Sequence, residues 1–204
     1  MLKRLFVLLL TLCLALPCAA MAELDEDGDI VVKLDGAEFF FTPPEGAHML
    51  SLESSASEFN ALGLSQRELV AWMEEYDLVV VFFDEAFGWE LHVQAYPCEY
   101  GDFDDLTDYG LLSEVSYLER LCREQGYEVL FAEGYRAPEG HQFVCIRSLY
   151  TYEDSTSEPQ VEYFTIQGNH AVSVYLMGYS EQLTDEQLAI AQAVADSLWI
   201  TPVQ

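Results

Sequence analysis

The feature of this sequence that most limits its fold is a set of tight turns between apolar, strand-like runs. Gly168-Asn169 separates the run VEYFTI from AVSVYLMGY, and Asp35-Gly36 divides DIVVKLDGAEFFFTPP into two short strands. Dipeptides of this kind favour two-residue hairpin turns. Strands joined so closely must run antiparallel. We therefore expect a sheet that is mostly antiparallel.

The apolar pattern within the runs predicts how deeply each strand is buried. Leu78–Phe83 is apolar throughout, which is typical of a strand covered on both faces. The segment 89–96 alternates apolar and polar residues, the period of a half-buried strand. Further strands are expected near 127–134 and 141–152.

Three segments have the spacing and the end signals of helices. Ser65 and Thr184 are each followed three residues later by Glu or Gln, so each predicts a helix start with a capping box. A helix between them ends at Gly126, a residue typical of helix ends. The apolar residues that share a face are Leu69, Trp72 and Met73 in the first helix; Leu111, Val115, Leu118 and Cys122 in the second; and Leu188, Ala191, Ala195 and Leu198 in the third.

The predicted order is two strands, a helix, two strands, a helix, four strands and a helix. Because the helices need apolar strand faces to pack on, this order predicts an α+β sandwich. Its central sheet is mostly antiparallel, with helices on one or both faces. Residues 30–204 are long enough for one such domain with its own core.

The N-terminal segment has the pattern of a secretory signal peptide. Lys3 and Arg4 precede an apolar run of twelve residues, and Ala20-Met21-Ala22 offers the small residues that signal peptidase accepts. We expect cleavage after Ala22, which divides the chain into a signal peptide at 1–22, an acidic leader at 23–29 and the domain. The protein would then act outside the cell or at its envelope. Two alternatives remain: an uncleaved N-terminal anchor, and a lipid anchor at Cys18, although Pro17 lacks the small side chain that usually precedes a lipidated cysteine.

The charge of the chain excludes two classes of partner. The sequence has 36 acidic residues against 8 basic ones, and two of the basic residues lie in the signal peptide. Such a surface repels nucleic-acid phosphates and anionic lipid head groups, so we expect neither as a partner. The acids at 23–29 do not predict a calcium loop, because Leu34 stands where the loop needs a bidentate Glu.

The two ends of the domain resemble a known family. GAEFFFTPPEG is a strand running into Pro and Gly, and VEYFTIQGNHAVSVYLMGYS is followed by the helix LTDEQLAIAQAVADSLWI. This combination is similar to secreted bacterial domains of the PsbP-like (Mog/PsbP) superfamily, over most of residues 30–202. The resemblance implies a central antiparallel sheet between helices, and a role in binding or assembly. It implies no catalytic residue.

A search for catalytic and metal-binding patterns is negative. The sequence has no nucleophile elbow, zinc-protease motif, phosphate loop or dinucleotide fingerprint, and its four histidines lack ligand spacing. We expect no enzyme activity, cofactor or metal. Cys98, Cys122 and Cys145 are expected as buried thiols, with a Cys122–Cys145 or Cys98–Cys145 disulfide as the alternative.

The function predicted from these observations is a non-catalytic domain that binds a protein or an envelope component. Phe87 and Trp89 flank Gly88 at a hairpin tip and are the candidate contact residues, unless they fold back onto the core. Two other hypotheses stay open. One is a small-ligand carrier, which a large apolar cavity between sheet and helix would favour. The other is an enzyme with an unrecognised acid–base or thiol site.

Overall fold

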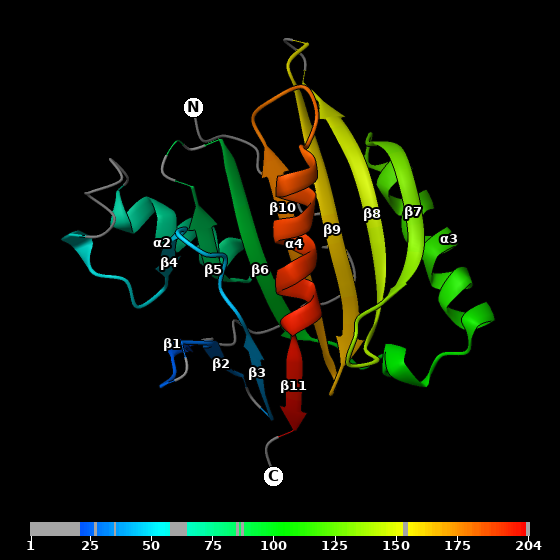
Figure 1. Ribbon diagram of the computed structural model, residues 1–204, viewed down its shortest axis with the longest axis horizontal. Coiled ribbons are helices and arrows are strands. Elements are labelled where there is room, and N and C mark those ends of the chain that lie inside the picture. The colour runs from blue at the N-terminus through cyan, green and yellow to red at the C-terminus, as the bar shows by residue number, and fades with distance from the viewer. Residues whose placement is uncertain are drawn as a thin grey trace.

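Two antiparallel sheets and three α-helices make up the part of the chain that the computed structural model describes (Figure 1). The described residues are 21–202 except 27, 35, 58–64, 85, 87, 153 and 154. This architecture confirms the predicted α+β class. The predicted signal peptide lies outside the described residues, apart from its last two positions.

The larger sheet has seven strands, in the order β4-β5-β6-β10-β9-β8-β7, and every neighbouring pair is antiparallel. Hairpins connect β5 to β6, β7 to β8, β8 to β9 and β9 to β10, and Gly168-Asn169 correctly predicted the last of these. Its strands are β4 (His48–Ser51), β5 (Leu78–Phe83), β6 (Trp89–Pro97), β7 (Glu128–Arg136), β8 (Gln142–Thr151), β9 (Ser157–Gln167) and β10 (His170–Gly178).

The smaller sheet was not expected. Its strands, in spatial order, are β1 (Met21–Leu24), β2 (Ile30–Leu34), β3 (Ala37–Phe41) and β11 (Trp199–Pro202). The turn at 35–36 correctly predicted the β2–β3 hairpin, but that hairpin does not join the central sheet. Glu23 and Leu24 pair with β2 as part of β1, so the description of 23–29 as a leader outside the domain was wrong for these two residues.

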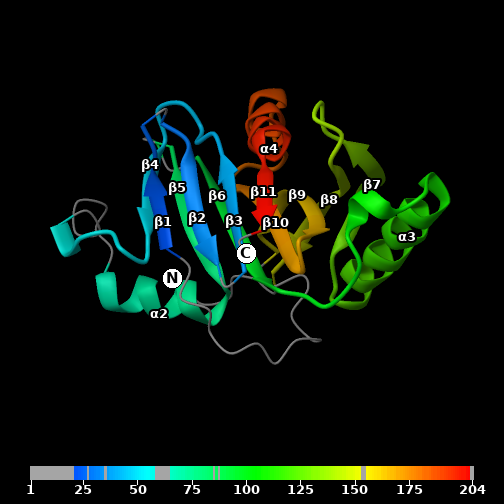
Figure 2. The ribbon, with the colours of Figure 1, turned by 90° about the horizontal axis from the view of Figure 1, so that it is seen from below.

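The helices cover both faces of the larger sheet. α4 (Asp185–Ser197) and the smaller sheet pack on one face, whereas α2 (Gln66–Glu75) and α3 (Asp108–Glu124) lie on the other (Figure 2). A short 3-10 helix, η1 (Phe103–Asp105), precedes α3. None of the helices in the described ranges has the length and apolar character needed to cross a membrane.

Alternation along the strands divides the core between the two faces. In β6, Leu91 and Val93 point toward α4, whereas His92 and Gln94 point to the opposite face. The α4 side has an almost wholly apolar core, with Phe39 and Phe41 from the smaller sheet packed against β5 and β6. The opposite face has apolar clusters under α2 and α3, separated by polar strand residues.

The end signals of the helices were partly correct. Thr184 and Gln187 form the predicted capping box at the start of α4. Ser65 occupies the N-cap of α2, but its side chain makes no capping hydrogen bond, so that part of the prediction was wrong. Gly168 and Asn169 both have positive φ, the backbone that the β9–β10 turn requires.

Candidate functional site

A cavity of about 470 Å³ lies between α3 and the larger sheet. Its floor comes from β6, β9 and β10, its side wall from α3, and its end wall from the segment 98–106. Most of its surface is apolar, and the rim includes the exposed rings of Tyr100 and Tyr117. The residues that form its inner walls are Tyr96, Phe103, Leu118, Leu121, Phe164, Ile166 and Ala171. A concave apolar site with a few polar groups is the usual form of a small-molecule site.

Three acidic side chains lie around the opening of this cavity. Asp102 and Asp105 come from the end wall, and Glu114 comes from α3. None of the three forms an ion pair with another residue of the described part of the chain. The opening therefore carries an uncompensated negative charge, which disfavours an anionic ligand.

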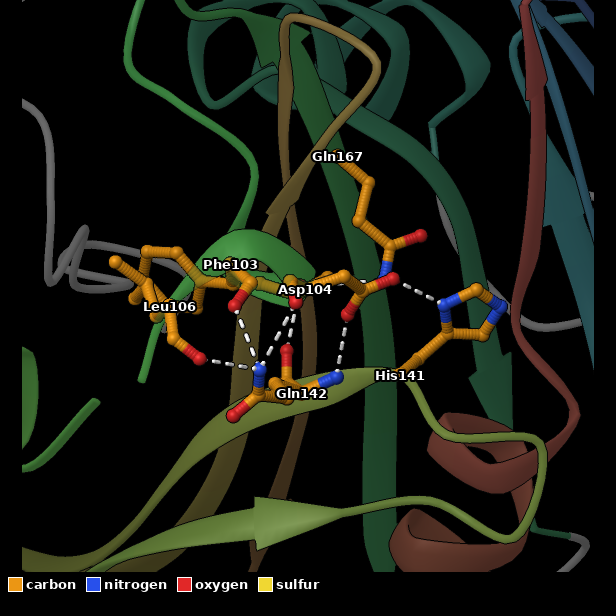
Figure 3. Close-up of polar contacts among 7 residues, drawn as sticks. Phe103, Asp104, Leu106, His141, Gln142 and Gln167 are labelled. Carbon is orange, nitrogen blue, oxygen red and sulfur yellow. Dashed lines mark hydrogen bonds and ion pairs between the residues drawn. The ribbon is translucent and has the colours of Figure 1, made fainter. Parts of the chain in front are cut away.

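The end wall is held in place by the Gln142 side chain (Figure 3). Gln142, at the start of β8, is 1% exposed. Its Nε2 donates to the carbonyl oxygens of Phe103, Asp104 and Leu106, at 3.0, 3.2 and 3.1 Å. Phe103 and Leu106 line the cavity, so this amide fixes the backbone that closes the cavity at one end.

Asp104 adds a second connection between the end wall and β8. Its carboxylate accepts a hydrogen bond from the backbone N–H of Gln142 at 2.7 Å and contacts His141 Nδ1 at 2.6 Å (Figure 3). The His141 ring also contacts the Trp199 ring, with centroids 5.1 Å apart. Nε2 of His141 has no hydrogen-bond partner among the described residues. This acid–histidine pair therefore acts on no nucleophile within the described structure, and we assign it to the positioning of the end wall.

A row of polar side chains lies beside the cavity on the same face of the sheet. The register places His92, Tyr175 and Glu162 side by side on β6, β10 and β9. Both Tyr175 and the cavity residue Ala171 lie on β10, four residues apart, so they share a face at a separation of about 13 Å. The polar row therefore lies on the same face of the sheet as the cavity, but its residues are buried and do not line the cavity.

Hydrogen bonds hold most of this row in place. The Glu162 carboxylate accepts a hydrogen bond from Ser173 Oγ at 2.7 Å, and burial raises the pKa of Glu162 to about 7. Glu90 contacts His92 Nε2 at 3.0 Å and accepts from the Tyr179 hydroxyl. Although burial alone would raise the pKa of Glu90, its contacts with His92 and the hydrogen bond from Tyr179 together lower that pKa.

The candidate contact residues at the hairpin tip do not form an exposed pair. Trp89 is 8% exposed and packs in the core on the α4 side, the second of the two alternatives that the sequence left open. Trp89 shares the core face of β6 with Leu91 and Val93, two and four residues further along the strand. The Asp84 carboxylate accepts hydrogen bonds from the backbone N–H groups of Gly88 and Trp89. Phe87 lies outside the described residues.

The three cysteines are buried and form no disulfide in the described part of the chain, as expected. Cys145 lies in the core on the α4 side, whereas Cys98 and Cys122 lie under α3 on the opposite face. The sheet therefore separates the partners of both alternative disulfides. Burial raises the pKa of the Cys145 thiol to about 11, which keeps it protonated and unreactive. No group of His, Cys, Asp and Glu side chains suited to a metal ion occurs within the described residues.

Most residues of the cavity had no signal in the sequence. The helical spacing of apolar residues predicts that Leu118 faces the sheet, but this spacing cannot distinguish the wall of a cavity from a filled core. The segment PCEYGDFDDL has neither helical nor strand period. Aromatic residues between Gly and Asp in a long connection were the one available hint that the segment lines a site.

Of the comparisons with known proteins, the comparison with solved structures finds similar proteins and the others do not. No family model matches the sequence, and no curated protein matches it. The solution structure of cyanobacterial PsbP (CyanoP) from Synechocystis sp. PCC 6803 aligns with 94% of this chain and 99% of its own, at 17% identity and a TM-score of 0.49. It is a protein of the family that the sequence resembles. A crystal structure from Bacteroides thetaiotaomicron aligns with 79% of this chain and 44% of its own, at 11% identity and a TM-score of 0.42.

Proposed function

We propose that this protein is a non-catalytic binding domain, acting outside the cytoplasm, that holds a small apolar ligand between α3 and the larger sheet. The observation that carries the proposal is the cavity of about 470 Å³ with its mostly apolar lining. A cavity of this size is within the range of small-molecule sites. The predicted signal peptide supports a location outside the cytoplasm.

The cavity favours a small ligand over a large partner. The candidate contact for a protein or envelope partner was an aromatic tip at Phe87 and Trp89, and Trp89 is buried. The cavity is deep enough to be lined by residues that are themselves buried, such as Phe103 and Leu118. A ligand placed there would exchange water for apolar contacts on several sides, which is the main source of affinity for an apolar molecule.

Binding of N-phenyl-1-naphthylamine tests this proposal. The dye is neutral, and its fluorescence rises in apolar surroundings. We expect the protein, expressed as the full chain, to bind the dye saturably with one site per molecule. Ala171→Trp places an indole on the cavity floor and should abolish this binding.

A matched variant distinguishes loss of the cavity from a general effect of a new Trp. Leu112 lies on the exposed side of α3, with 60% of its surface accessible, so Leu112→Trp should leave dye binding unchanged. Circular dichroism checks that each variant is folded. If Ala171→Trp does not fold, Leu121→Trp, in the partly buried wall of α3, makes the same test. Equal dye affinity in a folded, cavity-filled variant would refute the proposal.

A further inference from the structure

The wall that α3 contributes to the cavity is long. Glu114, Tyr117, Leu118, Leu121 and Gln125 line it, and their spacing of three or four residues places them along one side of the helix. Gln125 follows Glu114 by eleven residues, so at a rise of about 1.5 Å per residue the wall extends over about 16 Å. A ligand that fills the cavity therefore lies along the helix and has an elongated body.

The charge of the lining is concentrated toward one end of this wall. Glu114 lies in the first half of α3, whereas Asp102 and Asp105 come before the helix, at the two ends of the turn that contains η1. From Glu114 to the end of the helix the wall is neutral, and it finishes at the Gln125 amide. Within the described part of the chain, the lining includes no Lys, Arg or His. The cavity is thus apolar along its length and acidic at its opening.

The three carboxylates are within reach of a ligand in the cavity. Their residues belong to the lining and are in contact with solvent, because Asp105 is exposed and Asp102 and Glu114 are partly exposed. The ring of Tyr100, a residue that is 58% exposed, belongs to the same rim. A polar head group at the opening could therefore contact a carboxylate and an aromatic ring while the rest of the ligand stays in the cavity.

We infer that the cavity binds a cationic amphiphile, with its apolar body along α3 and an ammonium head at the opening, among Asp102, Asp105 and Glu114. This inference rests on the proposed function, because the cavity supplies the site for the apolar body. The head stays in contact with water at the opening, so it avoids most of the desolvation that a buried charge requires. The ligand class is a long-chain amine.

The opening discriminates between head groups by their charge. An ammonium group donates hydrogen bonds that carboxylates accept, and these bonds are stronger than those between neutral groups. The exposed ring of Tyr100 also attracts a cation. A contact of this kind already exists at the rim, since the Arg120 guanidinium lies 5.4 Å from the centroid of the Tyr117 ring. A carboxylate head would instead meet three like charges.

Displacement of the neutral dye by three matched compounds tests the inference. Decylamine, decanol and decanoate share one chain length, and at pH 7 their head groups are positive, neutral and negative. At low salt, below the concentrations at which micelles form, decylamine should displace half of the dye at about a fivefold lower concentration than decanol. Two exposed ion pairs together contribute about that factor. Decanoate should be the weakest, and concentrated NaCl should remove most of these differences, because salt screens exposed charges.

A triple variant locates the preference for the amine. Asp102→Asn, Asp105→Asn and Glu114→Gln together remove three charges and keep the shape of the opening. This variant should reduce the preference for decylamine over decanol to less than twofold. Decanol serves as the internal reference, because its neutral head does not respond to the lost charges.

A matched variant separates the charge at the opening from the charge of the whole protein. Glu68, Glu74 and Glu75 are exposed acids of α2, which lies at the other end of the same sheet face from α3 (Figure 2). Replacing all three by Gln changes the net charge equally and should leave the preference intact. Circular dichroism checks that both variants are folded. If the first does not fold, Glu114→Gln should lower the preference and Glu74→Gln should not.

The outcomes separate this inference from the proposed function. If the dye does not bind at all, the cavity is not a ligand site and the proposed function fails. If dye and decanol bind but decylamine has no advantage, the function stands and the inference is overturned. An amine preference that the α2 variant lowers as much as the variant at the opening overturns it as well, since the charge of the whole protein would then be the cause.

Discussion

Replacement of Gln142 by Leu should both destabilise the fold and damage the cavity. The Gln142 amide donates to three carbonyl groups of the end wall at 3.0 to 3.2 Å, in one buried and two partly buried hydrogen bonds. Leu has a similar volume and donates nothing, so the carbonyl groups of Asp104 and Leu106 lose this donor, whereas the Phe103 carbonyl keeps the backbone N–H of Leu106. The Gln142 Oε1 already lacks a partner among the described residues, and its removal offsets about one of those two losses. One unsatisfied group remains, which gives an expected loss of roughly 1–2 kcal/mol.

Urea unfolding followed by circular dichroism measures this loss, as a lower midpoint with an unchanged slope. The matched control is Gln192→Leu on α4, where an exposed amide donates to the Tyr135 hydroxyl at 3.0 Å, and it should cost less than about 0.5 kcal/mol. Dye affinity supplies a second readout, because Phe103 and Leu106 line the cavity and lose their fixed position. If Gln142→Leu is no more destabilising than Gln192→Leu, the assignment of Gln142 to the end wall is wrong.

Three further predictions concern the rest of the fold. Because burial raises the pKa of Glu162 from its ordinary value of 4.5 to about 7, Glu162 contributes stability below pH 4.5 that is lost as pH rises through 7. Between pH 4 and 8, the free energy of unfolding in urea should therefore fall by about 3 kcal/mol more in the wild type than in Glu162→Gln. A difference in stability between the two proteins that does not change with pH would contradict this. Gly134→Ala places a methyl group 2.5 Å from Leu111 Cδ2 and should cost about 1–3 kcal/mol; we expect Leu111→Val to recover part of that loss in thermal unfolding. Cys98, Cys122 and Cys145 should all be alkylated in denaturant without reductant, so a cysteine that mass spectrometry finds unmodified would contradict their assignment as thiols outside any disulfide.

Much of the larger sheet could be predicted from the sequence because its signals are local. Leu78–Phe83 coincides with β5, and the capping box at Thr184 marks the start of α4. In each case, neighbouring residues determine the structure. β4 and β11 have only four residues each, which is too short for an alternation of apolar and polar residues to be recognised. Their positions also depend on pairing with strands that are distant in the sequence.

The candidate site was harder to predict because it depends on contacts between distant segments. Gln142 lies 36 to 39 residues from the carbonyl groups that it contacts. Glu162 is an acid in a strand that is buried on both faces, and nothing in its neighbourhood distinguishes it from a solvated glutamate. The burial of Trp89 agrees with the alternation along β6, which places Trp89 on the same face as Leu91 and Val93, so this alternation was a better guide than the position of Trp89 beside the turn.

The pairing of β11 with β3 also determines when the protein can finish folding. Trp199 is opposite Phe40, so the edge of the smaller sheet requires two segments about 160 residues apart in the chain (Figure 1). During synthesis, β2 and β3 emerge first, and one edge of their hairpin stays unpaired until residues 199–202 leave the ribosome. Contacts between such distant segments form slowly, because a long loop must close first. The nascent chain therefore cannot complete the smaller sheet until residues 199–202 are free to pair with β3.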